Sequence, residues 1–235
     1  MSRSPDTIHA RGRAAVLAGR ELLDVPPVPG GTRWGLSLDV RPDPAAEGHL
    51  SALASEAARV AGPGQWVTGR RGSSHLTVTY LERLHREVAA DDAELARFAA
   101  VVARVAAVTP PLRWSVTGLA LADRGVLALA EPEDGAADAF RAAVLAELGE
   151  LGREEAGYRQ SVWWATLVHF AAPIVDRSAL VDWVDARVSV PPHPVVASSA
   201  EIVRYAHDGR NVVPVTLAAA PLAALPQGAP DGAHA

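Results

Sequence analysis

Apolar residues along this chain switch repeatedly between a spacing of two and a helical spacing of three to four, and this alternation most constrains its fold. Strand-type spacing falls at residues 34–40, 74–81, 112–119, 125–130, 161–170, 195–205 and 212–217. Helix-type spacing falls at residues 8–23, 44–62, 91–108, 133–151 and 177–188. The order is strand–helix–strand, helix, hairpin, helix–strand–helix, hairpin. It predicts a fold of mixed α and β elements, in which the two halves resemble each other in the order of their elements rather than in their amino-acid sequence.

The first helical segment is separated from the rest by Pro26-Pro27-Val28-Pro29-Gly30-Gly31, which cannot continue a helix. We predict that residues 1–31 form an N-terminal helical appendage with a Pro/Gly linker. Residues 32–217 then form a single domain. From Ala218 onward the chain is rich in Ala, Pro and Gly with almost no packing residues. Residues 218–235 are therefore expected to be a disordered tail.

The composition excludes several classes of protein and of chemistry. The 235 residues include no cysteine, so disulfides, thiolate metal sites and a cysteine nucleophile are impossible. All 22 basic residues are arginine, which excludes Schiff-base and phosphate-loop lysines. A net charge of −5 argues against broad binding to duplex nucleic acid. No stretch approaches the roughly 20 apolar residues of a membrane span, and we expect a soluble, cytoplasmic protein without membrane contact.

The strand at residues 74–81 carries the most informative motif, Ser-His-Leu-Thr-Val-Thr-Tyr-Leu. In a regular strand, residues two apart share a face, so His75, Thr77 and Thr79 are expected to project together. Tyr80 would then face the opposite layer. A neutral imidazole can take a proton from a hydroxyl or from water, and threonine can donate a hydrogen bond to a phosphoryl oxygen. The motif predicts one half of a phosphodiester site, with a chemistry that needs no metal.

The order of the segments and this motif resemble the 2H phosphoesterase superfamily, which includes 2′-5′ RNA ligase-like and cyclic phosphodiesterase proteins. The resemblance covers about residues 32–217. It implies an α+β fold, a bilobal and pseudo-symmetric pair of antiparallel β-sheets that face each other across a cleft, with helices packed outside. In that family each lobe contributes a His-x-Thr/Ser strand, with one histidine as general base and the other as general acid. The resemblance gives His75 and Thr77 the first of these pairs, and we assign the base to His75.

The expected second motif falls at residues 162–173 and is incomplete. Its Trp-Ala-Thr-Leu run resembles the His-x-Thr-Leu of the family, with Trp164 in the place of the histidine and Thr166 in the place of the hydroxyl. His169 follows three residues later. An odd offset places His169 on the opposite face of a regular strand, which makes it an imperfect substitute.

Three alternatives follow for the second half of the site. Trp164 replaces the acid and the chemistry is altered or lost, which is the alternative we favour. A β-bulge redirects His169 into the cleft. Another group, Tyr158 or Arg159, supplies the missing role.

Two further residues are candidates for binding. Arg71, next to Arg70 and just before the motif strand, could donate a bidentate hydrogen bond to a phosphate. Trp164 shares a face with Thr166 and could stack on a base, whereas Trp163 points the other way and is expected in the core. None of the remaining histidines has metal-ligand spacing, and we expect neither a metal nor a cofactor.

These motifs predict a metal-independent phosphodiesterase or 2′-5′ RNA ligase-like protein. It would act on a cyclic or 2′-5′ phosphodiester of RNA or of a nucleotide, with His75, Thr77, Thr166 and His169 as the catalytic candidates. The alternative is a catalytically degenerate module that binds a nucleotide or RNA without turnover. In a third alternative, the cleft has no function in binding or converting nucleotides.

Overall fold

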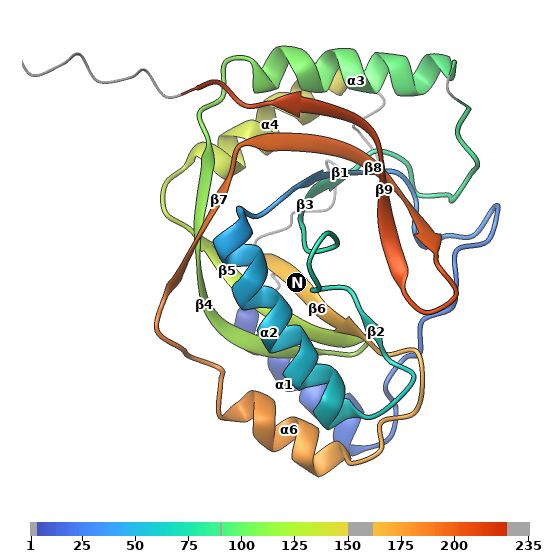
Figure 1. The fold of residues 1–235 in the computed structure, drawn as a ribbon, viewed down its shortest axis with the longest axis vertical. Helices are drawn as coiled ribbons and strands as arrows, with labels where there is room; N and C mark the ends of the chain where they lie inside the picture. Colours follow the sequence, from blue (N-terminus) through green and yellow to red (C-terminus); the bar gives the residue numbers. More distant parts are fainter. Residues whose placement is uncertain (1–3, 90, 150–161, 225–235) are drawn as a thin grey trace, which may run out of the picture.

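The computed structural model of the chain describes residues 4–89, 91–149 and 162–224. It contains two antiparallel sheets (Figure 1). The four-stranded sheet has the order β3-β1-β8-β9, with bounds Leu76–Tyr80, Ser37–Val40, Ser199–His207 and Val212–Pro221. The five-stranded sheet has the order β2-β6-β5-β4-β7, with bounds Trp66–Val67, Trp163–His169, Gly125–Pro132, Leu112–Ala122 and His193–Ala197. The α+β class expected from the sequence is confirmed.

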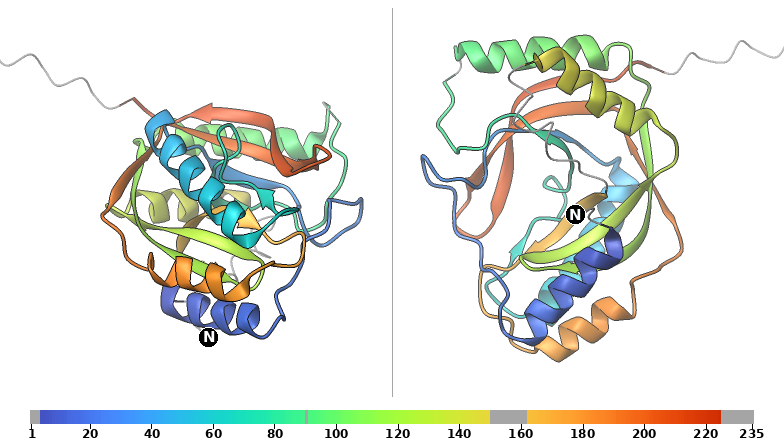
Figure 2. Two further views of the ribbon diagram at one scale, coloured as in Figure 1. Left: turned by 60° about the horizontal axis from the view of Figure 1, so that its bottom comes forward. Right: turned by 180° about the vertical axis from the view of Figure 1, so that it is seen from behind.

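Five helices lie in the described part of the chain. They are α1 (Pro5–Leu17), α2 (Pro44–Ala61), α3 (Ala93–Ala106), α4 (Ala136–Leu148) and α6 (Arg177–Asp185). All but α4 begin at a side chain that accepts hydrogen bonds from first-turn N–H groups, namely Ser4, Asp43, Asp92 and Asp176. The α3 helix covers β8 and β9, α1 and α6 pack on β4, and α2 packs on β6 and β7 (Figures 1 and 2). Among these helices, none has the length and apolar character that crossing a bilayer requires.

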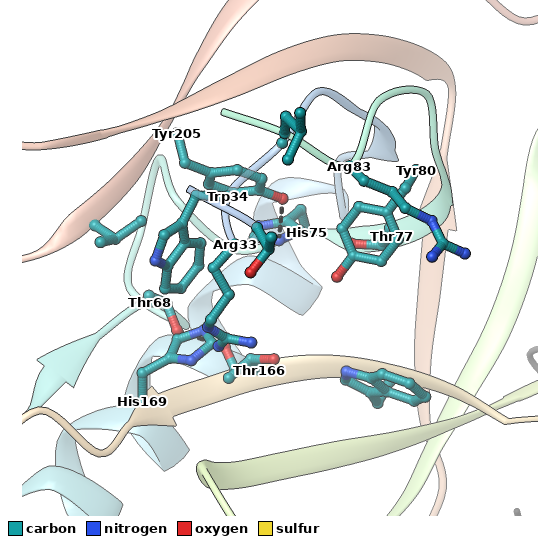
Figure 3. Close-up of a pocket in the computed structure, with 15 residues that line it drawn as sticks. Arg33, Trp34, Thr68, His75, Thr77, Tyr80, Arg83, Thr166, His169 and Tyr205 are labelled. Carbon is teal, nitrogen blue, oxygen red and sulfur yellow. Dashed lines mark hydrogen bonds between the residues drawn. The ribbon is translucent and has the colours of Figure 1, made fainter. Parts of the chain in front are cut away.

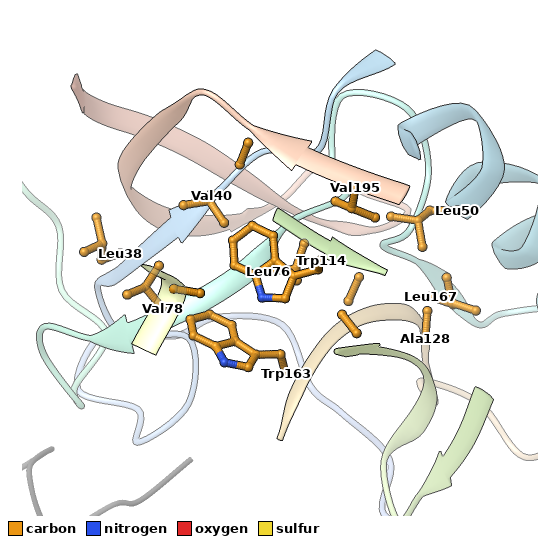
Figure 4. Packing of buried hydrophobic residues seen from close by; sticks show 14 of the residues in the cluster. Leu38, Val40, Leu50, Leu76, Val78, Trp114, Ala128, Trp163, Leu167 and Val195 are labelled. Atoms are coloured by element: carbon orange, nitrogen blue, oxygen red, sulfur yellow. The ribbon is translucent and has the colours of Figure 1, made fainter. Parts of the chain in front are cut away.

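One hydrophobic core joins the two sheets (Figure 4). Leu38 and Leu76 of the four-stranded sheet share it with Trp114 and Trp163 of the five-stranded sheet. The Trp163 side chain is 2% exposed, and its ring centroid lies 5.4 Å from that of Trp114, which confirms its expected place in the core. Because this core packs the sheets together, β3 and β6 come into contact although they belong to different sheets. The two motif strands therefore lie close together.

The single strand predicted at residues 195–205 is wrong, because the chain changes sheets there. The β7 strand pairs with β4, and β8 pairs with β1 and β9. Buried positions fall at Val195 and Ala197 and then at Ala200 and Ile202, so the alternation changes phase between the two strands. The segment at this crossing contains small residues but no Gly or Pro, so the sequence pattern resembles that of one continuous strand.

The ends of the chain also differ from expectation. The α1 helix ends at Leu17 rather than near residue 23, and Gly19 after it adopts a φ of 64°, which terminates the helix. At the other end, β9 continues to Pro221, four residues beyond the predicted end of the domain. These residues are ordered by pairing with β8, in which Ser199 opposes Pro221. Residues 225–235 of the predicted tail lie outside the described residues.

Candidate active site

A cleft of about 590 Å³ lies where β3 and β6 face each other. Its lining includes His75, Thr77 and Tyr80 from the first motif segment, and Trp164, Thr166 and His169 from β6. Figure 3 shows His75 and Thr77 on one side of this cleft and Thr166 and His169 on the other. Both motif strands therefore contribute side chains to one cavity.

His75 lies immediately before β3, and hydrogen bonds engage both nitrogens of its ring. Nδ1 lies 2.8 Å from the carbonyl oxygen of Ser73, which can only accept, so Nδ1 carries a hydrogen. Nε2 lies 3.1 Å from the hydroxyl oxygen of Tyr205. Only 12% of the His75 side chain is exposed. The imidazole is thus held in one orientation in the wall of the cleft.

Behind His75 lies a buried polar network centred on Asp39 of β1. The Tyr205 hydroxyl donates to Oδ2 of Asp39 at 2.8 Å, and the Ser37 hydroxyl donates to Oδ1 at 2.9 Å. The Asp39 side chain is fully buried, and Nε2 of His75 lies 3.7 Å from its Oδ2. Burial, followed by the charge of Asp39, raises the pKa of Tyr205 well above its ordinary value. Tyr205 therefore stays a hydroxyl that links the buried carboxylate to the imidazole.

A β-bulge in β3 changes which residues of the first motif face the cleft. Leu38 pairs with Thr79 and Asp39 pairs with Thr77, so Val78 has no partner across the strand pair. The extra residue reverses the alternation after Thr77. Tyr80 consequently lines the cleft, while Thr79 is buried. The predictions that Thr79 shares the face of His75 and that Tyr80 faces away are therefore wrong.

A second bulge occurs at the corresponding place in β6. Leu127 pairs with Thr166 and Val126 pairs with Val168, so Leu167 is the extra residue. Leu167 and Val168 are both buried, and His169 joins Thr166 in lining the cleft. The expectation that His169 lies on the face opposite Thr166 is wrong, because it assumed a regular period of two. The geometry is that of the second alternative, in which a bulge redirects His169.

The loop before the first motif holds this bulge in place. The Gly69 N–H donates to the Leu167 carbonyl at 2.9 Å, and the Thr68 hydroxyl donates to the Thr166 carbonyl at 3.1 Å. A Cβ at Gly69 would lie 2.9 Å from Cα of Leu167, which is too close for any other residue without a shift. The segment that leads into His75 therefore also fixes the shape of β6.

His169 is anchored by Asp24, a residue outside both motif strands. Its Nδ1 lies 2.8 Å from Oδ2 of Asp24, whose side chain is fully buried. Arg33 and Arg124 donate to the same carboxylate at 2.7 and 3.0 Å. Burial favours the neutral acid, but the bonds and charges of His169 and Arg33 outweigh it and lower the pKa of Asp24.

The pKa of His169 is also lowered, and burial is the main cause. The Asp24 carboxylate opposes this shift, whereas the charges of Arg33 and His75 add to it. Among the described residues no hydrogen bond engages Nε2 of His169, and this nitrogen is open to a ligand in the cleft. Burial and the hydrogen bond to Asp24 together favour a neutral His169 imidazole with hydrogen on Nδ1 and the lone pair on Nε2.

The two motif segments present their side chains at matching intervals. His75, Thr77 and Tyr80 line the cleft from one side, and Trp164, Thr166 and His169 line it from the other, with the bulged residue directly after each threonine. Trp164 therefore occupies the place equivalent to His75, and His169 the place equivalent to Tyr80. The cleft holds two histidines, but they are not related by the internal symmetry.

Arg71, the remaining predicted site residue in the described part of the chain, does not line the cleft. Arg71 is exposed and directs its guanidinium toward Gly48 of α2, and Arg70 pairs with Asp208 at 2.9 Å. Tyr158 and Arg159 lie outside the described residues. Within the described ranges, no group of three His, Asp or Glu side chains is arranged to hold a metal ion.

Several residues in the cleft or directly behind it were missed by the sequence analysis. Trp34 has a φ of 65°, and its ring lies 5.0 Å from that of His169 and 5.5 Å from that of Tyr205, so it bridges the two sides. Asp39 gave one usable signal, since a carboxylate within an apolar strand is rarely buried without a specific role. Asp24 gave no signal, because it lies in a segment with no periodic pattern.

Comparisons with known proteins identify the fold. No protein-family model matches the chain, and neither does any curated protein sequence. Among solved structures, TT0787 of Thermus thermophilus is 18% identical, with a TM-score of 0.57 over 80% of this chain and 97% of that one. E. coli LigT complexed with 3′-AMP is 11% identical, with a TM-score of 0.55 over 83% and 99%. A phosphoesterase is 13% identical, with a TM-score of 0.50 over 83% and 99%. The chain therefore has the fold of LigT and TT0787, in agreement with the α+β fold that the sequence resemblance implied.

Proposed function

We propose that this protein is a 2H-type phosphodiesterase that hydrolyses a cyclic or 2′-5′ phosphodiester of RNA or of a nucleotide without a metal ion. The observation that carries this proposal is that His75 and Thr77 from one segment and Thr166 and His169 from the other line a single cleft. Two imidazoles can supply a base and an acid, and two hydroxyls can donate to the phosphoryl oxygens.

In the proposed reaction, one imidazole takes a proton from a water molecule as the water oxygen bonds to phosphorus. The other imidazole gives a proton to an ester oxygen as its bond to phosphorus breaks. The products are a hydroxyl and a phosphomonoester, so one water is consumed. Each imidazole then regains its starting state by exchanging one proton with solvent. Hydrogen bonds from Thr77 and Thr166 stabilise the charge on the phosphoryl oxygens in the transition state.

The size and lining of the cleft support a nucleotide as the ligand. Its volume of about 590 Å³ lies within the range for small-molecule sites. Trp34, Tyr80 and Trp164 line it and offer aromatic faces on which a base can stack. The fold neighbour LigT has been crystallised with 3′-AMP, with NADP+ and with ATP, which supports the same ligand class here.

The proposal is tested by hydrolysis of 2′,3′-cyclic nucleotides and of a 2′-5′-linked dinucleotide in excess EDTA. We expect the wild type to form phosphomonoester, and His75→Ala and His169→Ala each to lower kcat by about 10² to 10⁴. His207→Ala is the matched control, since His207 packs on Trp66 away from the cleft lining. A wild type without turnover from pH 5 to 9, or histidine variants as active as the control, would refute the proposal.

A binding module without turnover is the second candidate, and the position of Trp164 favours it. Trp164 stands where the symmetry calls for a second histidine, and it lines the cleft. In this case Trp164→Ala should weaken nucleotide binding about 5- to 150-fold, because stacking on an aromatic side chain is worth about 1–3 kcal/mol. Calorimetric titration of 3′-AMP measures this change, and unchanged affinity would exclude the stacking role.

A further inference from the structure

Asp24 is a buried carboxylate in the segment between α1 and β1, and it contacts the cleft residue His169. Removing a carboxylate from water costs several kcal/mol unless partners compensate it. The two guanidinium groups of Arg33 and Arg124 and the ring of His169 surround it. A segment that only linked an appendage to the domain would not require such a group, so the placement of Asp24 points to a role in the cleft.

The contact between Asp24 and His169 fixes which ring nitrogen carries hydrogen. An ionised carboxylate can only accept, so Nδ1 of His169 donates to Oδ2 of Asp24. Nε2 then carries the lone pair and is open to the cleft. This is the arrangement by which a buried aspartate orients a histidine base in a Ser-His-Asp triad.

His75 differs from His169 at the corresponding atoms. The Tyr205 hydroxyl gives its one hydrogen to Asp39, so its oxygen can accept a hydrogen from Nε2 of His75 at 3.1 Å. Nδ1 of His75 already donates to Ser73. Both nitrogens of His75 thus have partners within the protein, whereas Nε2 of His169 has none among the described residues, so His169 is the better placed of the two to take a proton from water.

We propose that His169 is the general base of the site and His75 the general acid, with Asp24 as the positioning residue that orients His169. This assignment rests on the proposed function and reverses the role given to His75 from the sequence. Nε2 of His169 takes the proton of the attacking water, and Nε2 of His75 gives its proton to the leaving oxygen. The bulge at Leu167 and the carboxylate of Asp24 together place His169 in the cleft, whereas Trp164 occupies the place equivalent to His75.

The orientation of His169 is tested first, by a measurement that does not depend on activity. Long-range ¹H–¹⁵N correlation spectra report which imidazole nitrogen carries hydrogen, and the His169→Gln variant assigns the signals. At pH 7.5 we expect the wild type to be neutral with hydrogen on Nδ1, and Asp24→Asn to lose this preference, because the amide can donate to Nδ1. Hydrogen on Nε2 in the wild type, or an unchanged spectrum in Asp24→Asn, would overturn the role of Asp24. The wild-type spectrum decides this point even if the variant does not fold.

The role of His169 as base is tested by hydrolysis of a 2′,3′-cyclic nucleotide. We expect Asp24→Asn to lower kcat by about 10² to 10⁴ with KM within threefold of the wild type. Arg177→Gln is the control, since it removes the partner of Glu21, another buried carboxylate of the same segment, at 2.8 Å without touching Asp24 or His169, and its kcat should stay within threefold. Equal losses in both variants would show that Asp24 acts only on stability and would overturn its positioning role. The expected spectrum without any wild-type hydrolysis would instead overturn the proposed function and the base role, while the orientation by Asp24 stands.

Discussion

Replacing Tyr205 by phenylalanine removes one hydroxyl from the network behind His75 and keeps the ring. That hydroxyl donates to the fully buried carboxylate of Asp39 at 2.8 Å. A hydrogen bond to a charged group contributes about 1.5–3 kcal/mol. For a chain of this size each kcal/mol corresponds to about 2–4 °C in Tm, so we expect Tyr205→Phe to lower Tm by about 3–12 °C.

Urea denaturation of a double-mutant cycle separates this bond from general effects of the substitution. In an Asp39→Asn background the acceptor is neutral, and Tyr205→Phe should cost only about 0.5–1.5 kcal/mol in the free energy of unfolding. Thr216→Val is the control, because it removes an exposed hydroxyl that donates to Glu201 at 2.7 Å, and we expect a loss below about 1 kcal/mol. An equal cost of Tyr205→Phe in both backgrounds would refute the reasoning.

Three more predictions follow from the bulge, the symmetry and the buried histidines. Trp164→His, made in the His169→Ala background, should raise the rate of cyclic phosphate hydrolysis at least about tenfold, because Trp164 is equivalent to His75 and a general base contributes a factor of about 10² or more to the rate. An unchanged rate would contradict the equivalence. Gly69→Ala should lower the free energy of unfolding by about 1–3 kcal/mol, since its Cβ would lie 2.9 Å from both Cα of Leu167 and Cβ of Ala54; urea denaturation with no loss would show that this loop can move. Burial lowers the pKa of His169, and burial with the charge of His193 lowers that of His49, from the ordinary 6.5. Because the unfolded chain then binds more protons, the free energy of unfolding should fall as pH drops from about 6.5 toward the folded-state pKa. His49→Gln should reduce this pH dependence, measured by urea denaturation, and an unchanged dependence of the unfolding free energy on pH would contradict the prediction.

The two histidines of the cleft occupy non-equivalent positions in the two motif segments. Each strand keeps its threonine and its bulge, yet one histidine precedes the threonine by two residues and the other follows it by three. Because a bulge reverses the alternation, a residue three positions after the threonine enters the cleft. A strand of this fold therefore offers two places for a catalytic group, one on each side of its threonine.

The sequence by itself determined the fold class, most of the elements and the placement of His75 and Thr77 together on one side of a cleft. Strand and helix patterns depend on nearest neighbours along the chain, so the helix at residues 44–62 and the hairpin at 112–130 were found within a few residues of α2 and of β4 and β5. The motif at His75 and Thr77 could be identified because both residues lie in one short segment. The local pattern was also sufficient to separate Trp163 in the core from Trp164 in the cleft.

Only the tertiary structure decided the second half of the site. A β-bulge depends on the register between two strands. The sequence of one strand does not show which of its residues lacks a partner on the neighbouring strand, and Leu167 resembles any other apolar strand residue. Asp24 meets His169 across 145 positions of the chain, a contact that depends on how the first segment packs against the finished sheets. The existence of a cleft between the two motif strands could therefore be predicted from the sequence. The position of His169 in that cleft depends on strand register and on a carboxylate that is distant in the sequence.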